Sequence, residues 1–129
     1  MFKLLKERND MSIKTIKFFA GQARFLSLPY EEQYKELHFL GDYMTDDIAS
    51  DWIFPDSYKK FNKEYGENII SERASSLYEA IDRNFYDISL DGHKYDEIFW
   101  TLEGLKNHPL WNEQRRLAKE LLNELEKIE

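Results

Sequence analysis

Residues 67–88 read ENIISERASSLYEAIDRNFYDI, and this stretch decides the fold class. Its apolar side chains recur every three or four residues, which is the spacing of one face of an α-helix. Glu79 and Arg83 lie outside that face, one helical turn apart, and are spaced to form an ion pair. The stretch therefore predicts an amphipathic helix from about Glu67 to Ile88 whose buried stripe is Ile70, Ala74, Leu77, Ile81, Phe85 and Ile88.

The chain before this helix shows the same period. Ser12 is a suitable N-cap for a helix that runs to about Leu26 and buries Ile13, Ile16, Ala20 and Ala23. Pro29 can occupy the first turn of a second helix, which we expect to continue to about Ala49. A short helix over about Asp56–Tyr65 should end at Gly66, because glycine readily takes the left-handed conformation that closes a helix.

The chain after residue 88 continues the pattern. Asp91 and Gly92 indicate a turn. The next helix should run to about Asn107 with an apolar face of Tyr95, Ile98, Phe99, Leu102 and Leu105. Pro109 then begins a last helix whose buried side is Trp111, Ala118, Leu121, Leu125 and Ile128.

Composition supports one domain of this kind. The 129 residues are 42% hydrophobic and include only five glycines and three prolines, so turns for a many-stranded sheet are scarce. We predict an all-α fold, a compact bundle of five to six helices spanning residues 1–129, with residues 1–11 as a polar lead that frays. No signal peptide or membrane-spanning run is apparent and cysteine is absent, so a cytoplasmic protein without a membrane partner is expected.

The formal net charge of −7 is concentrated in one segment. Residues 31–56 hold eight carboxylates against a single base, Lys35, which gives −7 for that segment. The remaining segments carry +4 (1–30), −1 (57–90) and −3 (91–129), so they cancel. An acidic balance argues against nucleic-acid binding and favours a basic protein partner.

Two stripes follow from this segment when residues 29–49 are placed on a helix. One stripe faces the core and contains Tyr30, Tyr34, Leu37, Gly41, Met44 and Ile48. The opposite stripe contains Glu32, Glu36, Phe39, Tyr43 and Asp46, with Asp47 at its edge. Phe39 and Tyr43 are either covered by a second layer of the bundle or act as apolar anchors in an interface.

Trp52 presents the same choice, since it follows Asp51 in the sequence DWIFPD at 51–56. It either fills the core from a loop or extends the interface. The interface hypothesis takes as its partner-binding residues Glu32, Glu36, Phe39, Tyr43, Asp46, Asp47, Asp51 and Trp52.

Motifs for catalysis, metal binding or cofactor binding are absent from the sequence. His38, His93 and His108 are isolated, and no phosphate loop, dinucleotide fingerprint or nucleophile elbow occurs. We therefore expect neither an enzyme nor a cofactor. One alternative stays open, a small metal-assisted enzyme that uses Asp42, Asp46 and Asp47.

Four segments carry a resemblance to a known family. They are YDEIFWTLEGL at 95–105, PLW at 109–111, RRLAKELL at 115–122 and, upstream, SSLYEAID at 75–82. Over roughly the last 60 residues their pattern resembles bacterial colicin-like immunity proteins, including the partners of contact-dependent growth-inhibition toxins. Ordinary packing of a terminal helix would produce the same apolar spacing.

The resemblance implies a small helical protein that binds the C-terminal domain of one cognate toxin and blocks it. Many such toxins are basic nucleases, which suits an acidic inhibitor, and the family has no catalytic residues to carry over. The alternative is a helical adaptor or regulatory subunit that binds another protein. The inhibitor hypothesis favours a monomer over an oligomer.

Overall fold

The computed structural model describes residues 10–39, 48–49, 57–66 and 68–128. In these ranges the chain forms α-helices and one short 3-10 helix, with no strand: α2 (Asp10–Ser27), α3 (Tyr30–Phe39), α5 (Ser57–Tyr65), α6 (Glu72–Ile88), η1 (Glu97–Trp100), α7 (Leu102–Asn107) and α8 (Pro109–Glu126). The predicted all-α bundle of five to six helices is confirmed.

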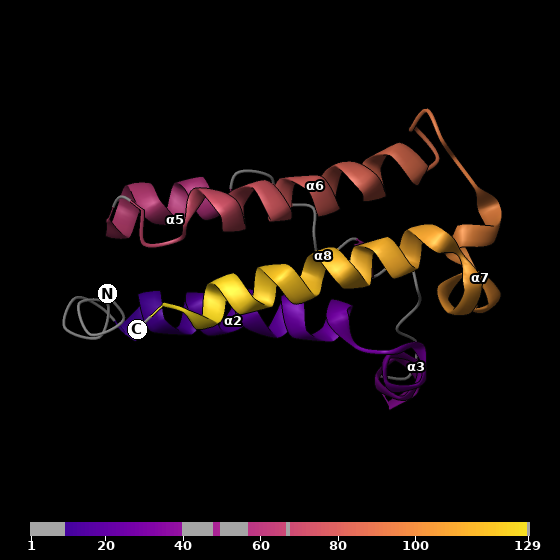
Figure 1. Ribbon diagram of the computed structural model, residues 1–129, viewed down its shortest axis with the longest axis horizontal. Helices are drawn as coiled ribbons and strands as arrows, with labels where there is room; N and C mark the ends of the chain where they lie inside the picture. The colour runs from indigo at the N-terminus through magenta and orange to yellow at the C-terminus, as the bar shows by residue number, and fades with distance from the viewer. Residues whose placement is uncertain (1–9, 40–47, 50–56, 67, 129) are drawn as a thin grey trace.

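The C-terminal helix α8 is the centre of the bundle. It packs against α2 on one side and against α6 on the other, and it runs antiparallel to both (Figure 1). The start of α2 and the end of α8 lie at one end of the long axis (Figure 1). At the opposite end lie α3, the end of α6, η1 and α7 (Figure 1). We call this opposite end the α3–α7 end.

The long stripes predicted from the sequence form the core. All six predicted stripe residues of α6 and its approach, from Ile70 to Ile88, are buried, as are Trp111, Ala118, Leu121 and Leu125 of α8. Ile16 and Ala23 of α2 are buried too, while Ile13, Ala20 and Ile128 pack partly buried against the same cluster. Burial beside Phe19 and Tyr78 also raises the pKa of Tyr58 far above its ordinary value, so this phenol stays protonated.

Two helix starts differ from the prediction. Ser12 lies inside α2 and is fully buried, so it is not an N-cap, and Asp10 and Met11 belong to the helix instead of the expected lead. The long helix begins at Glu72 because the hydroxyl of Ser71 accepts a hydrogen bond from the Ala74 amide. In addition, the Glu79 carboxylate, which the sequence places one turn from Arg83, forms an ion pair with Lys59 of α5 at 3.1 Å.

Other helix ends are where the sequence placed them. Gly66 has φ 143° and its amide bonds to the Asn62 carbonyl at 2.9 Å, so it closes α5. Pro109 is the first residue of α8. The Pro29 carbonyl accepts the amides of Glu32 and Gln33, which begins α3. Within the predicted continuation of α3 to Ala49, residues 40–47, which include Gly41 and Met44, lie outside the described residues; Ile48 and Ala49 are helical, and Ile48 is buried as the core stripe predicted.

The single helix predicted over residues 95–107 is wrong. The segment is divided at Thr101. The Thr101 hydroxyl accepts a hydrogen bond from the Gly104 amide and so caps α7, and the Thr101 amide donates to the Ile98 carbonyl at the end of η1. A side chain at Gly104 would place its Cβ 1.9 Å from the Ile98 carbonyl oxygen, so only glycine allows η1 and α7 to approach this closely. As a result Phe99 and Leu105 are buried, whereas Tyr95, Ile98 and Leu102 are exposed.

Candidate functional site

The orientation of α3 is fixed by a buried glutamine. Gln33 is fully buried, and its amide nitrogen donates to the Leu26 carbonyl at 3.0 Å and to the Phe25 carbonyl at 3.3 Å. Leu37, one turn later, is buried on the same side. Gln33 thus attaches α3 to the end of α2, and Leu37 anchors the same side of the helix in the hydrophobic core.

Arg115 of α8 completes this attachment. Its Nε and Nη2 donate to the Gln33 side-chain oxygen at 3.0 and 2.8 Å, and Nη2 also donates to the Leu105 carbonyl of α7. Burial lowers the pKa of the Arg115 guanidinium, and the nearby Glu31 carboxylate acts in the opposite direction. The half-buried guanidinium thus joins α3, α7 and α8 through hydrogen bonds that are partly shielded from water.

This attachment turns the acidic side of α3 toward solvent. Glu31, Glu32 and Glu36 are exposed, and we call them the α3 carboxylates. Glu32 is 3.6 Å from Lys35 in an exposed ion pair. Tyr34 is 42% exposed, so its predicted place in the core stripe is wrong; Gln33 occupies that place because its amide finds partners there.

Two of the eight predicted partner-binding residues can be placed. Glu32 and Glu36 lie on the solvent side of α3, as predicted. Phe39 ends α3, but its side chain is outside what the structure describes, so the choice between core and interface stays open for it. Tyr43, Asp46, Asp47, Asp51 and Trp52 lie outside the described residues, as does Asp42 of the alternative metal site.

His108 and Asp96 form a polar pair at the start of α8. The Nδ1 atom of His108 accepts the Leu110 amide at 3.0 Å, so the ring proton is on Nε2, which donates to Asp96 at 3.0 Å. This bond, with a further one from the Ile98 amide, lowers the pKa of the Asp96 carboxyl. Both ring nitrogens are engaged, so the pair caps α8 and ties it to η1 in this arrangement.

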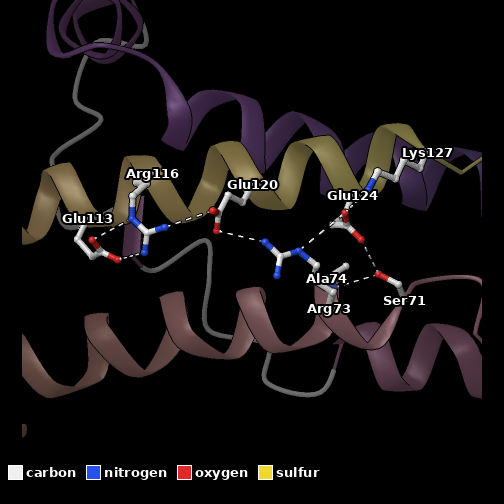
Figure 2. A network of polar contacts seen from close by, with 8 residues as sticks. All are labelled: Ser71, Arg73, Ala74, Glu113, Arg116, Glu120, Glu124 and Lys127. Carbon is white, nitrogen blue, oxygen red and sulfur yellow. Dashed lines mark hydrogen bonds and ion pairs between the residues drawn. The ribbon is translucent and has the colours of Figure 1, made fainter.

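Most other charges on α8 form a ladder, shown in Figure 2. Arg116 bonds to Glu113 and to Glu120, and Glu120 lies 3.7 Å from Arg73 of α6. Glu124 bonds to Lys127, to Arg73 at 4.0 Å and to the Ser71 hydroxyl at 3.3 Å. Three glutamates therefore face three bases, and this face is electrically balanced.

The net charge of −3 in residues 91–129 lies outside the balanced part of α8. Residues 104–129 contain five bases and five carboxylates, whereas residues 91–103 contain four carboxylates and one base. The charge of −3 for residues 91–129 thus comes entirely from residues 91–103, which follow α6 and end in the first turn of α7. Asp91, Glu97 and Glu103 are exposed there.

Exposed apolar side chains occur in the same stretch. Eight large hydrophobic residues of the described chain are exposed, and five of them fall between residues 86 and 102. We call these five the loop-end apolar residues: Tyr86, Leu90, Tyr95, Ile98 and Leu102. Sequence reasoning missed them, because helical spacing assigned Tyr95, Ile98 and Leu102 to the core; the Thr-x-x-Gly cap was the signal that could have separated them.

Two contacts hold this stretch against the bundle. The Trp100 indole donates to the Ile88 carbonyl at 3.0 Å, and the Lys94 amide donates to the Asp87 carbonyl at 2.7 Å. Beside it lies a cleft of about 530 Å³ whose charged lining is Asp87, Asp96 and Glu113 with Lys94. The cleft has the same negative sign as the stretch that borders it.

Among the described residues, no group of three carboxylate, histidine or cysteine side chains is arranged to hold a metal ion. No helix in the described part of the chain has the length and apolar composition needed to cross a bilayer. Comparisons with protein-family models, with curated proteins and with solved structures found no match to this chain.

Proposed function

We propose that this chain is an immunity protein, a non-enzymatic inhibitor that binds a basic toxin domain in the cytoplasm. The observation that carries the proposal is the attachment of α3 through Gln33 and Arg115, which holds Glu32 and Glu36 in a fixed position on the surface. A helix that displayed carboxylates only for solubility would not need a half-buried guanidinium bonded to a buried glutamine to fix its rotation.

Fixed carboxylates suit an inhibitor for two physical reasons. They attract a positively charged partner before contact, which speeds association. They also lose little conformational freedom on binding, because their helix is already ordered. A nuclease cleft that binds phosphates offers the complementary charge, and the acidic residues of 40–56 would extend the same sign of charge along the chain.

Removing two α3 charges should weaken binding. We expect Glu32→Gln with Glu36→Gln to reduce affinity about five- to thirtyfold for the toxin domain encoded immediately upstream, mainly through slower association. Calorimetry and stopped-flow mixing would measure the two quantities.

The matched control is Glu64→Gln with Glu72→Gln. It changes the net charge by the same amount as the α3 double variant, but at positions in α5 and at the start of α6. Those exposed residues lie toward the other end of the bundle (Figure 1). Equal losses for the two double variants would show that only net charge matters and would remove α3 from the site.

The adaptor or regulatory-subunit alternative is favoured by one observation, the exposure of the loop-end apolar residues. A surface of that kind is typical of proteins that associate with another subunit. Light scattering separates the alternatives: self-association that is insensitive to salt supports the adaptor, and a monomer supports the inhibitor.

A further inference from the structure

The loop-end apolar residues are concentrated in one part of the sequence, at one end of the bundle (Figure 1), whereas exposed apolar side chains are ordinarily scattered. Single exposed hydrophobic residues need no explanation, but several together mark interaction sites. Five of the eight in the described chain occupy 17 residues, from the last turn of α6 to the first turn of α7. Leu90 is 77% exposed and Ile98 is 60% exposed.

The stretch that carries them is held in place. The 89–96 segment is fixed by the bond from the Lys94 amide to Asp87 and by the Asp91–Gly92 turn, in which the Gly92 amide bonds to Ser89. The indole of Trp100 and the close approach at Gly104 fix η1 and α7. Ile98 and Leu102 are therefore displayed by an ordered backbone, as anchor residues of interfaces are.

The charge around these residues selects the kind of occupant. Asp91, Glu97 and Glu103 are exposed among them, and the neighbouring cleft is lined by three carboxylates and one lysine. A second copy of this chain would bring the same carboxylates and be repelled. Anionic lipid surfaces and nucleic acids would be repelled for the same reason. A basic protein surface is the complementary occupant.

We infer that the loop-end apolar residues, with the exposed Asp91, Glu97 and Glu103 beside them in the chain, are a docking surface for a basic protein whose own apolar recess receives Leu90 and Ile98. This inference rests on the proposed function and adds a second contact region to it. The α3 carboxylates and this surface lie at the same end of the bundle (Figure 1). In the proposed complex one partner domain covers this end and contacts both, with the apolar residues desolvated and the carboxylates in the polar surroundings.

The test is a comparison of matched variants against the purified toxin domain encoded immediately upstream. We expect Leu90→Ser with Ile98→Ser to reduce affinity about ten- to a hundredfold, through faster dissociation. The control is Phe18→Ser on α2, a side chain that is 62% exposed, which should change affinity less than about twofold. Thermal melts would check that all variants remain folded. If the double variant does not fold, the single variants Leu90→Ala and Ile98→Ala would be tested in its place.

The outcomes separate this inference from the function on which it rests. If wild type binds and Glu32→Gln with Glu36→Gln weakens binding, but the loop-end variants bind as wild type does, the docking surface is wrong and the proposed function stands. If wild type does not bind, both fall. If wild type is a dimer that Leu90→Ser with Ile98→Ser dissociates, the occupant is a second copy and the inference is wrong.

Discussion

Replacement of Trp111 with alanine is expected to lower the free energy of unfolding by about 3–5 kcal/mol. The indole is fully buried and stacks on Phe99, with ring centroids 4.3 Å apart and planes 1° apart. It also meets the edge of Phe85 at 5.5 Å. Its Nε1 donates to the Phe99 carbonyl at 2.7 Å, so truncation leaves a cavity and a buried carbonyl without its donor.

Denaturant unfolding would measure this loss. Trp111→Phe serves as the matched variant, because it keeps a packed aromatic ring while it removes the hydrogen bond and a smaller part of the buried volume; we expect it to lose about 1–3 kcal/mol. A loss below about 1 kcal/mol for Trp111→Ala would contradict the placement of this ring at the junction of α6, η1 and α8.

Replacement of Arg115 with leucine is expected to lower the free energy of unfolding by about 2–4 kcal/mol, because the buried Gln33 oxygen and the Leu105 carbonyl both lose their donor. It should also weaken partner binding, since α3 would no longer be held in one orientation. Denaturant unfolding would measure the loss of stability, hydrogen exchange would report how firmly α3 is held, and calorimetry would measure the loss of binding.

The adjacent residue supplies the control. Arg116→Leu removes an equal charge from the exposed ladder and should cost no more than about 1 kcal/mol. Combining Arg115→Leu with Gln33→Leu should be less destabilising than the sum of the single changes, because both partners are then apolar. Additive losses would show that the two side chains do not interact.

Much of the fold could be predicted from apolar periodicity. Long stripes such as Ile70–Ile88 repeat over several turns, so small errors at the ends do not change which residues are buried. Breaks in short segments could not be predicted this way. Residues 95–105 have helical spacing, but the cap at Thr101 and the contact at Gly104 divide them, and three of the five expected core residues are exposed.

The candidate site was predictable in its charge and less so in its geometry. The exposed positions of Glu32 and Glu36 follow from the pattern, whereas the burial of Gln33 depends on Arg115, which is 82 residues away along the chain. The acidity of residues 91–103 was not apparent from the sum of charges over residues 91–129. That sum also includes residues 104–129, which are electrically neutral and contain most of the ladder. Counting the two parts separately assigns the whole charge of −3 to residues 91–103, whereas the pairing of Arg73, Arg116 and Lys127 with glutamates is visible only in the structure.

The acidic surface at the α3–α7 end is proposed to bind a basic protein domain. The most direct test of this claim is calorimetry of the wild-type protein with the C-terminal toxin domain encoded immediately upstream, at about 50 mM and about 300 mM salt. We predict an equimolar complex of nanomolar affinity that weakens markedly at the higher salt concentration. Absence of binding at low salt, or an affinity that does not change with salt, would contradict the claim.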